Sequence, residues 1–178
     1  MKKQFIKKSY DASAEFYDKR YKELQETKYK KLITPLVIEK LKKAQLVLDI
    51  GAGTGLLHEY LEKRGIDATI TGIDISHNML KIAQEKGQEN ITGDADFLPF
   101  KKESFDVVVS FTTLQNLPSF ELIFKEIKRV LKHEGLFIFS ILRKNFDNSI
   151  FDILSTQGFM IISEHDCGED IGFVCLAA

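Results

Sequence analysis

The chain alternates short apolar runs rich in β-branched residues with longer stretches of helical periodicity, and this alternation restricts its fold more than any other feature. Seven runs are predicted as strands: residues 46–50, 69–74, 90–92, 105–110, 136–142, 159–164 and 171–176. Helices are predicted over residues 55–64, 77–86 and 120–133, and each is followed by a glycine suited to a helix C-terminus, Gly65, Gly87 and Gly135. Strands that alternate with helices indicate an α/β domain with right-handed crossovers.

The two ends of the chain depart from this alternation. Only about residues 166–170 separate the last two strands, which is too short for a crossover helix and predicts an antiparallel hairpin. Two helical patterns, residues 9–25 and 28–42, precede the first strand. We therefore expect a single domain, residues 1–178, with N-terminal lid helices over 1–43 and a doubly wound, mostly parallel core over 44–178.

Composition excludes several classes of protein. Of the 178 residues, 44% are hydrophobic and 29% are charged, which excludes a disordered or fibrous chain. No apolar run approaches the roughly 18 residues that a membrane span needs. Cys167 and Cys175 are too few for a disulfide framework or a four-ligand zinc site. We expect a cytoplasmic protein with no metal site and no membrane contact.

The N-terminal segment is basic and carries a stripe of tyrosines. Residues 1–31 hold ten basic and five acidic side chains, which fits either an arm that attracts an anionic ligand or the solvated face of a helix. Tyr10, Ala14, Tyr17 and Tyr21 share one helix face. That stripe is typical of simple packing, but tyrosine hydroxyls also suit a lid that reaches a polar ligand.

A glycine-rich turn follows the first strand. Residues 47–55 read Val-Leu-Asp-Ile-Gly-Ala-Gly-Thr-Gly, and glycines there let the backbone approach a ligand at the start of a helix. Asp74 ends the second strand near the offset at which an acid binds ribose hydroxyls. The dinucleotide fingerprint requires a third glycine where this chain has Leu56. The turn is therefore a candidate site for a nucleoside ligand, although it lacks the dinucleotide-binding fingerprint.

Four blocks in order resemble the class I S-adenosylmethionine-dependent methyltransferases, particularly the small-molecule type related to ubiquinone biosynthesis. They are residues 49–55, 72–76, 93–100 with 104–108, and 131–136. In the last block His133 and Glu134 depart from the family's Leu-Lys-Pro-Gly-Gly turn. The resemblance implies a Rossmann-like, seven-stranded sheet whose final strand is antiparallel. It also implies S-adenosylmethionine as cofactor and S-adenosylhomocysteine as product.

The resemblance implies a role for most residues of a cofactor site. Asp49 would hold the ammonium of the cofactor, Asp74 both ribose hydroxyls, and Asp94 the adenine amino group. The amide of Ala95 would meet an adenine ring nitrogen, and Tyr10 would cap the carboxylate. Ile75, Met79 and Phe97 fit either an adenine slot or the core. The expected cofactor-binding set is Tyr10, Asp49, Gly51, Ala52, Gly53, Asp74, Ile75, Met79, Asp94 and Ala95.

Catalytic residues and the methyl acceptor stay open. Thr113, Gln115 and Tyr17 are the candidates, but Gln115 stands where many relatives have histidine and cannot act as a base. Only residues 143–158 separate the fifth and sixth strands, so the acceptor site needs a roof from the N-terminal helices, a second copy, a partner subunit or the substrate itself. The acceptor could be a small molecule, a protein or an RNA.

Two other functions remain open. A non-catalytic S-adenosylmethionine-binding regulatory or scaffold subunit fits the lack of an evident base. An NAD(P)-dependent oxidoreductase shares the overall pattern, but Leu56 and the final hairpin oppose it.

Overall fold

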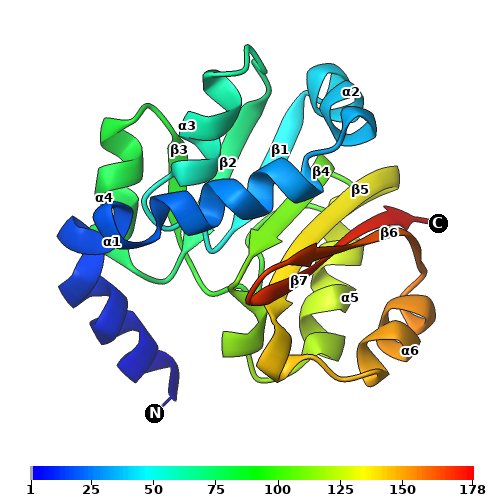
Figure 1. Cartoon of the computed structure of the whole chain (residues 1–178). Coiled ribbons are helices and arrows are strands. Elements are labelled where there is room, and N and C mark those ends of the chain that lie inside the picture. The colour runs from blue at the N-terminus through cyan, green and yellow to red at the C-terminus, as the bar shows by residue number, and fades with distance from the viewer. Residues whose placement is uncertain (1) are drawn as a thin grey trace.

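The computed structural model describes residues 2–178 and forms one seven-stranded sheet with helices on both faces (Figure 1). The strands are β1 (Leu46–Ile50), β2 (Thr69–Asp74), β3 (Glu89–Thr92), β4 (Phe105–Phe111), β5 (Leu131–Leu142), β6 (Phe159–Cys167) and β7 (Asp170–Ala177). The helices are α1 (Lys2–Leu32), α2 (Pro35–Lys43), α3 (Leu56–Glu62), α4 (His77–Glu85), α5 (Phe120–Val130) and α6 (Ser149–Thr156), with 3-10 turns η1 (Leu114–Asn116) and η2 (Arg143–Asn145).

The strand order is β3-β2-β1-β4-β5-β7-β6. Neighbours from β3 to β5 pair in parallel, whereas β7 is antiparallel to both β5 and β6. The predicted doubly wound sheet and C-terminal hairpin are confirmed. Because β1 pairs with both β2 and β4, the winding direction reverses there, and such a reversal opens a crevice at the carboxyl ends of the strands.

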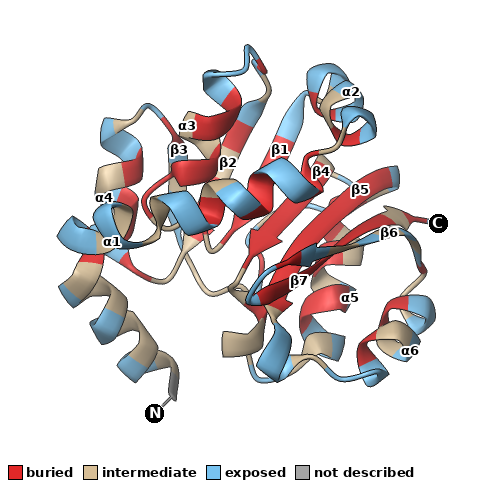
Figure 2. Ribbon diagram, viewed as in Figure 1, coloured by how far each residue is buried: buried red, intermediate tan, exposed pale blue. Residues whose placement is uncertain are grey.

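Two hydrophobic layers sandwich the sheet. On one face α5 and α6 cover a cluster that includes Phe124, Phe137 and Phe139. On the other face α2, α3 and the last turns of α1 cover a cluster that includes Leu32 and Val47. Figure 2 shows the central strands almost fully buried, while the outer faces of the helices are exposed. Burial on both faces explains why these strands read as continuous apolar runs.

The N-terminal helices differ from the prediction of helices over residues 9–25 and 28–42. α1 is one helix of 31 residues, and the break comes later, before α2. Thr34 caps α2 by accepting a hydrogen bond from the Val37 N–H at 3.4 Å, and Pro35 occupies its first position. Nothing in residues 26–28 stops a helix, so the proline sets the boundary. α1 changes direction along its length (Figure 1), and the Ser13 hydroxyl donates to the Ser9 carbonyl, a bond that often bends helices.

The helix predicted over residues 120–133 also ends earlier. α5 stops at Val130 because Leu131 already pairs with Phe105 as the start of β5. The left-handed residue in this turn is Glu134, with φ of 57°, so Gly135 is not a helix C-cap. Gly65 and Gly87 do adopt the left-handed conformation expected after α3 and α4. Among the described helices, none is long and apolar enough to cross a membrane.

Candidate active site

A pocket lies at the carboxyl edge of the sheet, beneath α1. The space between its walls, with the open solvent at its mouth included, is about 970 Å³. Its lining comes from the ends of β1, β2 and β4, from residues 93–95 and from α1. The pocket therefore occupies the crevice that the reversal of winding creates.

The turn after β1 has a backbone that only glycine accommodates. Gly51 has φ of 77°, and a Cβ there would lie 2.1 Å from the Thr113 hydroxyl oxygen. Gly53 has φ of 55°, and its N–H donates to the Asp74 carboxylate at 3.0 Å. The loop thus packs directly against the end of β4 and presents backbone rather than side chain to the pocket.

Asp74 is held in one orientation. One carboxylate oxygen accepts from Gly53, and the other accepts from the Ser76 N–H at 2.8 Å. Burial raises the pKa of Asp74, while these backbone hydrogen bonds lower it. Each oxygen keeps a further lone pair for a ligand in the pocket.

Asp49 is the most deeply buried acid of the pocket, with 3% of its surface exposed. No described residue donates a side-chain or loop hydrogen bond to its carboxylate. Burial, with a smaller contribution from the negative charge of Asp74, raises the pKa of Asp49 to about 7. A buried, unpaired carboxylate is costly, and a cationic ligand group would relieve that cost.

α1 crosses the carboxyl edge of the sheet, and its polar contacts follow the strand order. Beginning at its N-terminus, these contacts join Lys3 to Asp94 and Asp96, Asp11 to Ser76, Asp18 to Thr54, Lys22 to Glu59, and Lys28 to Thr112 and Asp170. They therefore run from the loop after β3, past the ends of β2 and β1, to β4 and β7. The helix is a lid over the whole pocket.

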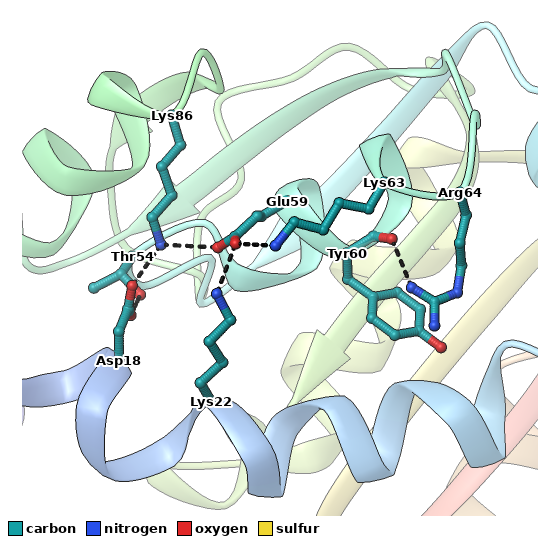
Figure 3. Close-up of polar contacts among 8 residues, drawn as sticks. All are labelled: Asp18, Lys22, Thr54, Glu59, Tyr60, Lys63, Arg64 and Lys86. Atoms are coloured by element: carbon teal, nitrogen blue, oxygen red, sulfur yellow. Dashed lines mark hydrogen bonds and ion pairs between the residues drawn. The ribbon is translucent and has the colours of Figure 1, made fainter.

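The middle of this lid is held by a charge cluster centred on Glu59 of α3 (Figure 3). Glu59 accepts from Lys22 at 2.6 Å and from Lys63 at 2.5 Å, and it lies 3.6 Å from the Lys86 ammonium. Asp18 of α1 pairs with Lys86 at 2.6 Å. The hydrogen bond from Lys22, followed by that from Lys63, lowers the pKa of Glu59 to about 2. The cluster ties α1 to both α3 and α4.

A buried polar network holds the C-terminal part of the lid. Lys28 is 7% exposed and donates to the Thr112 hydroxyl at 2.5 Å, while its ammonium lies 3.1 Å from the fully buried Asp170. Thr112 and Ser140 both donate to Asp170, at 2.6 and 2.7 Å. Thr112 has φ of 55°, a strained conformation for a β-branched residue. This strain sits at the end of β4, on the pocket wall.

Residues 48–139 match the family described as a methyltransferase domain, and this match covers more than half of the chain. The chain belongs to this family. The resemblance to class I S-adenosylmethionine-dependent methyltransferases is thereby confirmed, and S-adenosylmethionine is the cofactor of the family.

Curated relatives of this methyltransferase domain are longer proteins. An uncharacterised protein of Methanocaldococcus jannaschii is 40% identical over 138 residues, which cover 76% of this chain and 51% of the relative. The demethylmenaquinone methyltransferase of Thermotoga maritima is 35% identical over 142 residues, covering 76% of this chain and 61% of the relative. The chain thus spans about half to three fifths of the length of these relatives.

Solved structures share the fold of the methyltransferase domain over nearly its full length. A chain from the complex between the Haloferax volcanii Trm112 methyltransferase activator and a candidate methyltransferase aligns with a TM-score of 0.78, 18% identity and 97% coverage of both chains. An S-adenosylmethionine-dependent methyltransferase of Thermotoga maritima aligns with a TM-score of 0.70 and 21% identity, covering 95% of this chain and 98% of the other. At such identities the likeness establishes the fold.

The structure brings most of the predicted site residues of this domain together. The ten expected cofactor-binding residues all line the pocket, as do Tyr17 and Thr113. Gln115 does not line it, because its amide nitrogen instead donates to the Thr112 carbonyl at 2.6 Å. Phe97 is 80% exposed and lies outside both the pocket lining and the core.

Sequence reasoning missed further lining residues, among them Lys3, Gln25 and Tyr29. A signal for two of them was present, because Gln25 and Tyr29 continue the Tyr17–Tyr21 stripe at four-residue spacing. The stripe was cut short by the helix boundary predicted at residue 25. For Lys3 the sequence offers only the basic character of residues 1–31, which does not point to one residue.

Proposed function

We propose that the protein transfers a methyl group from S-adenosylmethionine to an acceptor that is not yet identified, by in-line displacement. The observation that carries the proposal is the row of three carboxylates, Asp49, Asp74 and Asp94, along one pocket at the ends of neighbouring strands. Their spacing along the sheet edge suits a ligand with an ammonium, a ribose diol and an adenine amino group in that order.

The chain's residues fit each part of that cofactor. Asp49 would pair with the ammonium, for which its unpartnered carboxylate is suited. Asp74, oriented by two backbone N–H groups, would accept from both ribose hydroxyls. The backbone of Gly51 and Gly53 would lie against the methionine chain, and Tyr10 would donate to its carboxylate.

The adenine end involves a group of the lid. Both oxygens of Asp94 accept from Lys3 at 2.7 Å, and Lys3 also pairs with Asp96. A carboxylate has about four lone-pair positions, so Asp94 can accept from an adenine amino group beside Lys3. Lys3 would then close the lid over the adenine, while Ala95 offers its amide and Ile75 and Met79 offer apolar surface.

The chemistry demanded of the protein is mainly positioning. When bound, S-adenosylmethionine supplies an electrophilic methyl group on a sulfonium, which makes alignment and exclusion of water the main tasks. Burial raises the pKa of Tyr17, so at neutral pH its hydroxyl donates hydrogen bonds and does not act as a base. Tyr17 and Thr113 would orient the acceptor, and no histidine is among the described residues that line the pocket.

We further propose that a second chain helps to form the acceptor site in a cytoplasmic protein. Only η2 and α6 lie between β5 and β6, so this part of the fold adds little to the roof of the site. One structural neighbour comes from a complex with a methyltransferase activator, which supports a partner subunit, and a second copy of this chain is the alternative. Cys167 and Cys175 are free thiols, which supports a reducing compartment. Light scattering of the purified protein would distinguish a homodimer from a chain that needs another partner.

Calorimetric titration tests the cofactor. We expect S-adenosylmethionine and S-adenosylhomocysteine to bind and NAD not to bind. Asp74→Ala should weaken binding of S-adenosylhomocysteine roughly ten- to one-hundredfold, because hydrogen bonds to a charged group are worth about 1.5–3 kcal/mol. Asp67→Ala, which changes an exposed acid outside the pocket, is the control. Binding of NAD alone, or unchanged affinity in Asp74→Ala, would contradict the proposal.

The alternative of a non-catalytic scaffold subunit requires a separate assay. Incubation with labelled S-adenosylmethionine and separated extract fractions of small molecules, protein and RNA should label one fraction. Cofactor binding without transfer to any fraction, with and without candidate partner subunits, would favour the scaffold.

A further inference from the structure

Gln25 is a buried polar side chain whose hydrogen bonds are incomplete. It lies on α1, is 7% exposed and lines the pocket. Its amide nitrogen donates a long hydrogen bond, 3.4 Å, to the Tyr17 hydroxyl. Its amide oxygen is buried without a partner among the described residues. Such a group costs about 1–3 kcal/mol unless something pairs with it, and in a pocket a ligand is the natural partner.

The contacts of α1 locate Gln25 along the pocket. Asp18 contacts Thr54 in the loop after β1, and Lys28 contacts Thr112 at the end of β4. Gln25 lies between these two positions on the same helix. Tyr29, one turn further on, packs its ring 4.9 Å from that of Phe111. Gln25 therefore belongs to the β1–β4 end of the pocket, away from Asp94 and Lys3.

The Asp49 side chain faces the same β1–β4 end of the pocket as Gln25. Tyr29 and Val47 belong to one hydrophobic cluster, on the sheet face that α1 and α3 cover. Asp49 follows Val47 by two positions on β1, and side chains two apart in a strand point to the same face. This end of the pocket thus holds two buried acceptors that no described side chain satisfies, the Asp49 carboxylate and the Gln25 amide oxygen.

A primary ammonium matches this pair, because it is positively charged and donates three hydrogen bonds. Tyr10, whose ring lies 6.3 Å from that of Tyr17, lines the same pocket, and its hydroxyl can donate to a carboxylate attached beside that ammonium. A carboxylate and an ammonium on one carbon are the end group of an α-amino acid. The adenine and ribose, by contrast, would be bound at the other end of the pocket.

We propose that Gln25 accepts a hydrogen bond from the α-ammonium of the cofactor and makes the lid selective for a nucleoside that carries an amino-acid end. This inference rests on the proposed function, because it assigns a residue to the same cofactor site. It makes Gln25 a specificity-determining residue that acts together with Asp49, although it lies on the lid and outside every family motif.

The test compares two ligands that differ in this end group. S-adenosylhomocysteine carries the amino acid, whereas 5′-methylthioadenosine keeps the adenine, ribose and sulfur and lacks it. In calorimetric titrations, Gln25→Leu should weaken S-adenosylhomocysteine roughly ten- to one-hundredfold, the range for a hydrogen bond to a charged group. Binding of 5′-methylthioadenosine should change by less than about twofold. The ratio of the two affinities is a readout that a general loosening of the lid does not alter.

Gln88→Leu is the matched control, since Gln88 is also a buried glutamine with an unpartnered amide but does not line this pocket. It should leave the ratio unchanged, and Gln25→Met provides a second variant if Gln25→Leu does not fold. Equal weakening of both ligands, or no weakening of either, would overturn the assignment of Gln25. If the wild-type protein binds neither compound, the proposed function itself fails, and the assignment with it.

Discussion

At the scale of single residues, the Asp49 carboxylate lowers the stability of the ligand-free protein and is also suited to bind a cationic ligand group. Its carboxylate is buried without a described side-chain donor, and burial raises its pKa to about 7. Because the folded pKa lies above the unfolded value, this group favours the folded state at low pH, and that contribution is lost as pH rises toward 7. A bound ammonium would reverse the balance by stabilising the charged form. The charged group that adds to this shift is Asp74 of the same pocket, and the charge of Asp49 in turn helps to raise the pKa of Tyr29 on the lid.

A pH titration of binding tests this arrangement. We expect the affinity for S-adenosylhomocysteine to fall about three- to tenfold from pH 8 to pH 6, because protonated Asp49 no longer pairs with an ammonium. Asp49→Asn should bind more weakly at pH 8 and lose this pH dependence. An equally steep pH profile in the variant would exclude Asp49 as its source.

The same substitution should make the ligand-free protein more stable. Removing the buried charge of Asp49 should raise the free energy of unfolding at pH 8 by roughly 1–3 kcal/mol, and the gain should shrink toward pH 5. Urea unfolding at the two pH values measures it. Lower stability of Asp49→Asn at pH 8 would show that the carboxylate has a stabilising partner.

At the scale of elements, α1 is held in two ways. Its N-terminal and middle parts rest on partly exposed ion pairs such as Lys3–Asp94 and Lys22–Glu59. Its last turns are fixed by buried contacts, including Leu32, against which Gly172 of β7 packs without room for a Cβ. Because salt screens exposed pairs more than buried ones, we expect salt to loosen the N-terminal and middle parts of the lid more than its last turns.

Glu59→Gln tests the middle of the lid. Since ion pairing lowers the pKa of Glu59 to about 2, its contribution to stability is present above pH 4.5 and is lost as pH falls toward 2. The side chain is 20% exposed, so we expect a loss of only about 1 kcal/mol at pH 7 in urea unfolding. The difference from wild type should narrow between pH 5 and pH 3. Glu62→Gln removes an exposed charge from the same helix and should change the free energy of unfolding little. An equally large loss in this variant would mean that the charge of the helix, and not the ion pairs of Glu59, accounts for the effect.

At the scale of the whole molecule, the Lys28–Asp170 pair joins the first helix to the last strand. Breaking a buried ion pair by removing one partner typically costs about 3–5 kcal/mol. We therefore expect Lys28→Met to lower the free energy of unfolding by roughly that amount. Lys43→Met, which breaks the exposed Lys43–Glu39 pair, should cost less than about 1 kcal/mol. Similar losses in the two variants would mean that Lys28 and Asp170 contribute no more than a surface pair.

The sequence predicted those parts of the fold and site that local patterns encode. The strands and the lining residues Gly51 and Asp74 follow from strand-end motifs, because parallel strands bring their carboxyl ends to one edge. Asp94 was predicted only from the family resemblance. The predicted boundary between the two N-terminal helices was wrong because nothing in residues 26–28 stops a helix, and the break comes only before Pro35. Gln115 was predicted to face the acceptor because it follows β4. In the structure its amide nitrogen donates to the Thr112 carbonyl, and the side chain does not line the pocket.

The span of α1 also has a consequence for synthesis of the chain. Proteins are made from the N-terminus, at about 5–20 residues per second. α1 therefore leaves the ribosome well before β7, the strand against which Leu32 and the Lys28 ammonium pack. The last turns of the helix that covers the pocket cannot complete these buried contacts until the final strand has been made.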